Sequence, residues 1–274
     1  MQSLFHDKLK TIAYTFYMNS GFTTEKLDAY FRTLLDIDGF SGSDNSLNGL
    51  QVDNNGEEIK KIAFAVDASL ECFRRASACG AGMLFVHHGL FWGSPLRLKG
   101  GLRERIKFLL DNNLSLYGVH LPLDQHPSLG NNAVMAELLG IENPEPFGLY
   151  SGRKIGYKGN LSQALSTDEA SQRISYMGRP ALNLYPFGKD LNYSAAIVSG
   201  GAAMDAIQAI DEGVDLFISG EASHSVYHHA MEAKLNIIAG GHYSTEVWGV
   251  RRIMETIARQ FHIDTEFIDI PTGL

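Results

Sequence analysis

The chain has 274 residues and 45% hydrophobic content, which suffices for one large domain or two ordinary domains with a sizeable core. Its formal net charge of −8 argues against nucleic-acid binding, because phosphate contacts need an excess of Lys and Arg. No run of 18 apolar residues occurs, and the N-terminus lacks a cationic segment followed by an apolar core. We therefore expect a cytoplasmic protein that contacts no membrane.

The first predicted elements form a β-α-β unit. Thr23-Thr24 can cap a helix that continues to Leu35, and a polar loop at 39–48 follows it. The next strand, helix and strand are predicted at 62–66, 68–79 and 83–86. Gly80 is suited to end the helix. Two strands joined by one helix predict a parallel sheet with a right-handed crossover.

Helical and strand patterns continue to alternate up to residue 140. The predicted elements are a helix at 103–112, a strand that ends at His120 and a helix at 131–139. Between about Pro144 and Asn192 the pattern changes, which indicates a domain boundary near residue 145. From Ala195 the earlier order returns as a strand, a helix and a strand at 196–198, 202–211 and 216–218.

These elements predict an α/β protein of two similar domains. The first comprises residues 1–145 and the second residues 146–274. Residues 1–22 are expected to form an N-terminal extension, and a C-terminal strand at 262–271 is expected to return to the first domain. Helices alternating with strands are the sequence signature of this fold class.

An internal repeat indicates that the two domains arose by duplication. Setting Gly80 against Gly213 aligns the strands that follow these glycines. The same alignment places His87-His88 opposite Gly220-Glu221.

Histidine and carboxylate side chains recur in this repeat at strand ends. His120 and Asp124 are four residues apart, and His242 and Glu246 repeat that spacing after another apolar run. His87-His88 ends a third such run. Because loops after strands present ligands, these residues predict a metal site at the domain interface. Imidazole and carboxylate ligands together suit Zn, Mn or Fe.

The adjacent histidines favour a centre with two divalent metal ions. If a loop turns His87 and His88 beyond the end of their strand, the two rings can face different ions. Asp124 or Glu246 can bridge ions roughly 3.5–4 Å apart, and such a centre activates water for hydrolysis at neutral pH. The alternative is a closed structural site, although such sites commonly use cysteine and none lies near these motifs.

A second polar cluster begins at Glu221. Because the repeat places Glu221 opposite His88, we assign it a general acid/base role, and the alternative is that it caps the next helix. We expect His224 to line the site. His228 and His229 are also compatible with a solvated helix face.

Two polar loops remain open to more than one interpretation. The turn at 199–202 could admit a phosphate at a helix N-terminus, but neither a Walker motif nor a G-x-G-x-x-G motif accompanies it. The segment at 44–52 mixes amides with glycine, and it either lines a pocket or serves only as a connection.

Six motifs resemble, in the same order, the interacting-factor-three-like family, whose members are commonly labelled GTP cyclohydrolase 1 type 2 homologues. The motifs are Asn48-Gly-Leu-Gln-Val, His87-His88-Gly-Leu-Phe-Trp, Leu116-Tyr-Gly-Val-His-Leu-Pro-Leu-Asp124, Leu129-Gly-Asn-Asn, Ser219-Gly-Glu221 and Ala239-Gly-Gly-His-Tyr-Ser-Thr-Glu246. The His-Leu-Pro-Leu-Asp form and the short length are similar to the YbgI-like bacterial branch. The resemblance runs from about Thr24 to Pro271.

This resemblance implies two α/β domains with a dinuclear metal site between them. It also implies a ring-shaped homohexamer, a toroid with the sites facing its central cavity. It implies that the metal ligands are His87, His88, Asp124, His242 and Glu246, and that His120 lies beside the site. Leu121-Pro122 replaces the Thr-Asn of many members, and Gly89 replaces a proline, so no substrate preference is transferred.

Two functions from different classes follow. The first is a metal-dependent hydrolase of a small substrate such as a nucleotide or a pterin. The alternative is a non-catalytic metal-binding ring that serves as a scaffold or interaction protein. Metal ions with exchangeable water would distinguish the hydrolase from the scaffold.

Overall fold

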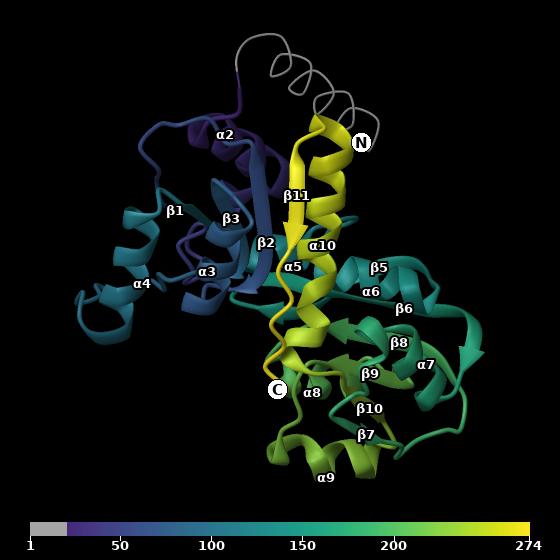
Figure 1. Cartoon of the computed structure of the whole chain (residues 1–274). Coiled ribbons are helices and arrows are strands. Elements are labelled where there is room, and N and C mark those ends of the chain that lie inside the picture. Colours follow the sequence, from purple (N-terminus) through teal and green to yellow (C-terminus); the bar gives the residue numbers. More distant parts are fainter. Residues whose placement is uncertain (1–20) are drawn as a thin grey trace. The chain divides into compact units, whose positions relative to one another are not determined.

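The computed structural model describes residues 21–274, which divide into two compact units (Figure 1). Unit 1 comprises the chain up to Pro122 together with Val250–Ile270, and unit 2 comprises Leu123–Gly249 with Pro271–Leu274. Most of the predicted extension at 1–22 lies outside the described residues. In residues 21–274, no helix combines the length and apolar character needed to span a bilayer.

Unit 1 contains a five-stranded sheet in the order β1-β4-β3-β2-β11. Its elements are α2 (Thr24–Leu35), η1 (Ile37–Phe40), β1 (Gly49–Val52), β2 (Lys61–Asp67), α3 (Leu70–Ala78), β3 (Met83–His88), α4 (Gly100–Asp111), β4 (Ser115–Gly118) and β11 (Asp264–Phe267). β1 runs antiparallel to β4, and the other neighbours are parallel. The predicted β-α-β unit is therefore confirmed.

Local capping explains where α3 begins and ends. The Ser69 hydroxyl accepts a hydrogen bond from the Cys72 N–H at 3.1 Å, which fixes the first turn. The helix ends before Gly80, whose φ of +79° is easily adopted only by glycine.

Side chains that alternate along the strands of unit 1 pack on opposite faces of its sheet. Ala65, Leu84 and Val86 belong to a buried cluster that includes Phe73 of α3. On the other face, the Phe31 ring of α2 lies 5.1 Å from Phe85 and 5.0 Å from Tyr117, measured between ring centroids. A sheet covered on both faces requires the near-continuous apolar strands that the sequence contains.

Unit 2 contains a six-stranded mixed sheet in the order β5-β6-β8-β9-β10-β7. The division between the units falls within α5 (Leu121–Gln125). The other elements of unit 2 are α6 (Asn131–Leu139), β5 (Ile141–Tyr150), β6 (Arg153–Leu165), α7 (Thr167–Arg173), η2 (Tyr176–Gly178), β7 (Asn183–Tyr185), β8 (Asn192–Val198), η3 (Ala203–Asp205), α8 (Ala206–Asp211), β9 (Leu216–Ser219), α9 (His224–Ala233) and β10 (Asn236–Ala239). β8, β9 and β10 are mutually parallel, and the other pairs are antiparallel. The helix predicted at 202–211 is divided into η3 and α8.

Residues 123–145, which the sequence pattern placed in the first domain, lie in unit 2. Met135, Ala136 and Leu139 of α6 pack in a buried cluster with Ile197 and Ile218 of the second sheet, and this explains the position of the division. In contrast, β11 pairs in parallel with β2, so the predicted C-terminal strand does return to the first sheet.

α10 (His242–Phe261) is the longest described helix, and the division between the units falls within it (Figure 1). Its first two turns, which carry His242 and Glu246, belong to unit 2.

Candidate metal centre

In unit 1, polar side chains gather at the carboxyl ends of three adjacent parallel strands. Asp67 ends β2, His88 ends β3, and His120 follows β4 by two residues. Because these strands are parallel, their carboxyl ends meet at one edge of the sheet, where α/β proteins bind ligands. β3 was expected to end at Val86, but it continues through His88, which pairs with Asp67 of β2.

The two adjacent histidines are each held through Nδ1 by an oxygen acceptor. His87 donates from Nδ1 to the Val119 carbonyl at 2.9 Å, and His88 donates from Nδ1 to Asp67 Oδ1 at 2.8 Å. A carbonyl or carboxylate oxygen can only accept, so in the neutral ring the proton lies on Nδ1 and Nε2 carries the lone pair. The ring centroids of His87 and His88 lie 4.6 Å apart.

His120 is fixed in the same way by the polar loop before β1. It donates from Nδ1 to Asp44 Oδ1 at 3.0 Å, and its backbone N–H donates to Asn48 Oδ1 at 2.7 Å. The Asp44 carboxylate also accepts from Ser46 N, Asn48 Nδ2 and Leu121 N. Burial raises the pKa of Asp44, but the hydrogen bond and charge of His120, together with hydrogen bonds from Asn48 and Ser46, outweigh burial, and the pKa falls to about 2. The loop before β1 therefore holds His120 in place and does not serve only as a connection.

The three histidines of unit 1 form a compact group. One ring nitrogen from each of His87, His88 and His120 can be chosen so that all three lie within 4.8 Å of one another. The Trp92 ring meets His120 edge-on, with the centroids 4.9 Å apart, and donates from Nε1 to the Gly89 carbonyl.

In unit 2, His242 and Glu246 lie on consecutive turns of α10. His242 begins this helix, and its Nε2 lies 3.2 Å from Glu246 Oε1. The sequence pattern placed both residues in a loop, whereas the helix itself brings positions i and i+4 to one face. Asp124 likewise lies in a helix, α5, rather than in a loop.

Glu221 accepts the second hydrogen bond of His242, from Nδ1 at 2.6 Å. The hydrogen bond with Glu246 and the charge of Glu221 together raise the pKa of His242 to about 9, against the opposing effect of burial. Glu221 does not cap α9, because the capping hydroxyl belongs to Ser223, which accepts from Ser225 N. The helix-cap interpretation of Glu221 is therefore wrong.

Asp124 is buried and hydrogen-bonded within unit 2. Its Oδ1 accepts from Ser199 Oγ at 2.8 Å and from Asn131 Nδ2 at 2.9 Å. Asn131 is itself fixed, since its Oδ1 accepts from the Gly249 N–H. These contacts orient the carboxylate.

The turn after β8 lies against the carboxylate of Glu246. Gly200 has a φ of +66°, which favours glycine, and a Cβ added there would lie 2.2 Å from Glu246 Oε1, so the carboxylate would have to move. The neighbouring Ser199 hydroxyl binds Asp124. Two carboxylates beside this turn disfavour the phosphate site that the sequence left open.

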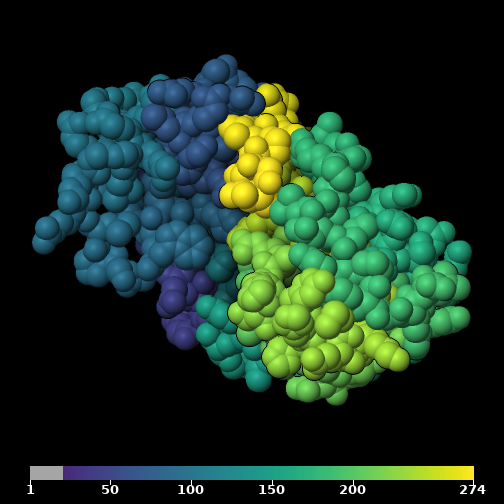
Figure 2. Space-filling view, turned by 90° about the horizontal axis from the view of Figure 1, so that it is seen from below, coloured from purple at the N-terminus to yellow at the C-terminus, as the bar shows by residue number. Residues whose placement is uncertain are grey.

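The other histidines of the second polar cluster take no part in these contacts. His224, His228 and His229 are all exposed on α9, which forms part of the surface seen in yellow-green in Figure 2. His224 was expected to line the site, and its exposure gives no support for that role.

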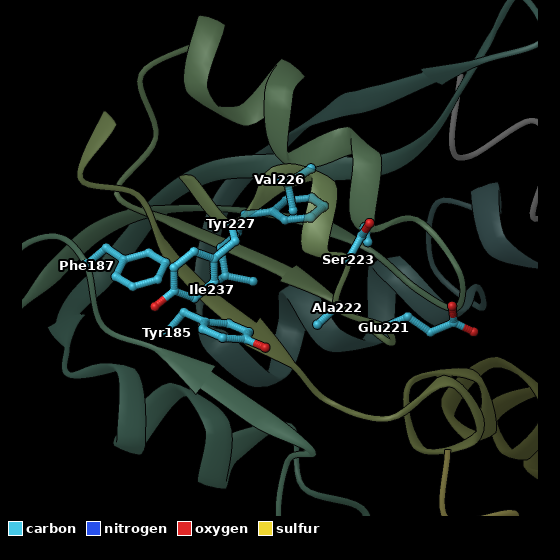
Figure 3. A pocket seen from close by; sticks show the side chains of 10 residues that line it. Tyr185, Phe187, Glu221, Ala222, Ser223, Val226, Tyr227 and Ile237 are labelled. Atoms are coloured by element: carbon cyan, nitrogen blue, oxygen red, sulfur yellow. The ribbon is translucent and has the colours of Figure 1, made fainter. Parts of the chain in front are cut away.

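A hollow in unit 2 extends from Glu221 to a group of aromatic rings (Figure 3). Tyr185 and Phe187 line it from the β7 side, and Tyr227 lines it from α9. The Phe187 and Tyr227 rings meet edge-on with centroids 5.1 Å apart.

The side chains fit transition-metal ions. Four imidazoles have Nδ1 bonded to an oxygen, which is the arrangement that orients metal-binding histidines towards Nε2. Asp124 and Glu246 add carboxylate oxygens. This mixed set of nitrogen and oxygen donors suits Zn, Mn or Fe.

The fold and these side chains define a class of two-sheet α/β proteins with imidazole and carboxylate groups at the carboxyl ends of the parallel strands. Residues 22–273 match the model of the Duf34/NIF3 (NGG1p interacting factor 3) family, and the chain belongs to this family. The resemblance inferred from the six motifs is confirmed.

Curated relatives and solved structures agree with this assignment. A protein of Archaeoglobus fulgidus is 47% identical over 85% of this chain and 93% of its own length, and one of Treponema pallidum is 39% identical over 92% and 100%. Both are named GTP cyclohydrolase 1 type 2 homolog. The structure of the protein ybgI, described as of unknown function, has a TM-score of 0.84 at 35% identity over 92% of this chain and 100% of its own. A protein of Thermus thermophilus has a TM-score of 0.83 at 34% identity, with the same coverage.

Proposed function

We propose that this protein is a metal-dependent hydrolase of a small substrate and binds two divalent metal ions. The proposed ligands are His87, His88, Asp124, His242 and Glu246. In this proposal the two units arose by duplication.

One observation carries the proposal. In unit 1 imidazole or carboxylate groups stand at the carboxyl ends of the adjacent parallel strands β2, β3 and β4, and in unit 2 Glu221 and His242 follow the adjacent parallel strands β9 and β10. In each unit a carboxylate holds the Nδ1 of a histidine, as Asp67 holds His88 and Glu221 holds His242. Two units that repeat one arrangement of ligands support a centre with two ions and an origin by duplication.

The chemistry favours hydrolysis. Two bound ions would activate water and polarise the bond to be broken. Glu221 is placed to hold or move a proton at Nδ1 of His242, from which it lies 2.6 Å away. This placement supports an acid/base role for Glu221.

We propose a substrate with a planar ring, such as a nucleotide or a pterin, that packs against the aromatic rings at the surface. Tyr185, Phe187 and Tyr227 offer apolar ring surface to a heterocycle at one end, and Glu221 lies at the other (Figure 3). The name GTP cyclohydrolase 1 type 2 homolog of the relatives points to the same class of substrate. Substitution of Tyr185 by Ala should therefore raise KM more than it lowers kcat.

Metal content and turnover test the proposal together. Elemental analysis of the wild-type protein should find close to two transition-metal equivalents per chain, and the His242→Ala, Glu246→Ala double variant should contain clearly less. Unchanged metal content in that variant would show that His242 and Glu246 are not ligands.

Turnover provides the second test. In a screen of metabolites, Asp124→Ala should abolish any turnover that the wild type shows, whereas the exposed His228→Gln should retain it. Two ions without any turnover would favour the non-catalytic scaffold.

We also propose that the chain assembles into the ring-shaped homohexamer that its family resemblance implies. Sedimentation at micromolar concentration should then give a mass near six times 30.1 kDa. A monomer under these conditions would refute the assembly.

A further inference from the structure

We propose that α9 carries a separate metal site on the surface of unit 2, in which His224 and His228 together hold one exchangeable transition-metal ion. Neither residue is among the proposed ligands of the dinuclear centre. The inference therefore does not rest on the proposed function, and it stands or fails with residues of α9 alone.

The first argument is the spacing of the two histidines on one helix. α9 runs from His224 to Ala233, and the Ser223 hydroxyl caps its first turn. Residues at positions i and i+4 of a helix lie on one face, with their Cβ atoms about 5–6 Å apart. This is the spacing at which the two histidines of an H-E-x-x-H helix bind zinc. The two rings can thus reach one ion, whose nitrogen ligands lie at most about 4.2 Å apart.

The second argument is the face on which the pair lies. Val226 and Ala230 are the buried residues of α9 and mark its inner face. Because each residue of a helix turns by about 100°, His224 and His228 lie on the opposite face, and both are exposed. Within residues 21–274, neither imidazole takes part in a hydrogen bond or an ion pair. Their ring nitrogens are therefore available to an ion from solution.

A carboxylate lies one turn further along the same face. Glu232 is exposed and follows His228 by four residues, so its charge attracts a cation held by that histidine. The positive end of the helix dipole lies near His224 and opposes this attraction, but it should weaken binding only by roughly two- to fivefold. Chelation by two linked ligands gains roughly 10²–10⁴-fold over one ligand. The chelate effect therefore outweighs the dipole.

The ligands determine the class of ion. Imidazole suits Zn, Ni and Cu, with Cu²⁺ bound more tightly than Zn²⁺, whereas Mg²⁺ and Ca²⁺ require oxygen ligands. Zinc usually has four ligands, so an ion on α9 keeps two positions for water. Because only two side chains hold it, the ion should exchange readily and be lost on gel filtration into metal-free buffer.

Uptake of Zn²⁺ by the full-length protein tests the site. Gel filtration empties it first, and equilibrium dialysis against ⁶⁵Zn²⁺ then measures the ion taken up per chain. His224→Gln and His228→Gln should each weaken this uptake at least tenfold, and the double variant should be little weaker than either single variant, because one lost ligand already abolishes the chelate. His229→Gln is the matched control and should change nothing. The residues four positions before and after His229 are Ser225 and Ala233, which offer neither imidazole nor carboxylate.

Three results would overturn the inference. The first is a wild type that takes up no Zn²⁺ beyond what the His224→Gln, His228→Gln double variant takes up. The second is a loss of uptake in His229→Gln equal to that in His228→Gln. The third comes from crystals of the wild type soaked in Zn²⁺, in which anomalous diffraction would show no ion between His224 and His228. This last measurement does not depend on the folding of any variant.

Two further variants separate this site from the proposed function. The His242→Ala, Glu246→Ala variant should still take up Zn²⁺ on α9, whatever becomes of the dinuclear centre. The His224→Gln, His228→Gln variant should lose the α9 ion and keep both its tightly held metal and any turnover that the wild type shows. Loss of the tightly held metal from that variant would mean that the α9 histidines belong to the main centre, and a separate site would be excluded.

Discussion

At the scale of single residues, three carboxylates orient histidine rings and do not bind a metal ion themselves. Asp44, Asp67 and Glu221 each accept a hydrogen bond from the Nδ1 of a histidine. Each of these bonds selects one tautomer and one ring orientation, which are the properties that decide how well an imidazole binds a metal. The three carboxylates therefore matter as much as the histidines.

Substitutions at Glu221 separate its two roles. Gln can still accept from His242 Nδ1, so Glu221→Gln should keep both metals and lower turnover of a true substrate by roughly 10²–10⁴-fold if the carboxylate moves a proton. Glu221→Ala removes the acceptor and should in addition weaken metal binding by about 10–100-fold. Metal content and kcat of the two variants provide the measurement. Full activity of the Gln variant would exclude the acid/base role, and loss of metal from it would make Glu221 a ligand.

The pH dependence of the metal-free protein reports on His242. Its pKa is raised from 6.5 to about 9 in the folded state by Glu246 and Glu221, so its contribution to stability is fully present below about pH 6.5. That contribution is lost as the pH rises through about 9. Urea unfolding in the presence of EDTA should show this decrease for the wild type and a smaller one for His242→Gln. Identical pH profiles for the two proteins would contradict the assignment.

The sequence identified the candidate ligands but not the residues that hold them. His120 with Asp124 and His242 with Glu246 share a local spacing, which a pattern search can detect. The contact between His120 and Asp44 joins residues 76 positions apart, and no local pattern encodes such a contact. Asp67 had a detectable signal that was overlooked, because it directly follows a predicted strand, as His87 does.

At the scale of elements, local signals determined how well the boundaries could be predicted. The helix predicted at 131–139 matches α6, which Gly140 ends with a φ of +76°. The long antiparallel pair of β5 and β6 was not predicted, because its strands are largely polar and exposed on one side. α10 was also not predicted, since its first residues follow directly on a strand and a Gly-Gly pair.

Substitution of a glycine in the turn after β8 can be tested against the same substitution of its neighbour. Gly200→Ala would place a methyl group 2.2 Å from Glu246 Oε1 at a backbone φ of +66°. We expect it to destabilise the metal-free protein by about 1–3 kcal/mol and to lower its metal content. Gly201→Ala should be tolerated, because the nearest atom, His242 Cε1, lies 3.6 Å from the added Cβ. Urea unfolding and elemental analysis distinguish the two, and equal behaviour would show that the turn can relax.

At the scale of the whole molecule, metal ions should contribute to stability by mass action. An ion that binds only the folded chain adds about 2.7 kcal/mol per site at 100 times its Kd. Removal of metal by a chelator should therefore lower the unfolding temperature of the wild type, and restored metal should raise it again. The change should be smaller in the His242→Ala, Glu246→Ala variant. An unfolding temperature that does not respond to metal would argue against ligands held by the native fold.

The position of β11 has a consequence for the synthesis of the protein. All strands of the second sheet lie between Ile141 and Ala239, so that sheet can form before the chain is complete. The first sheet begins at Gly49, but its edge strand β11 at 264–267 follows all the strands of the second sheet along the chain. During translation the edge of β2 that β11 covers therefore stays unpaired until residues 264–267 have been made. An open strand edge is a place where chains aggregate, so β11 closes a risk that the first sheet carries during most of its synthesis.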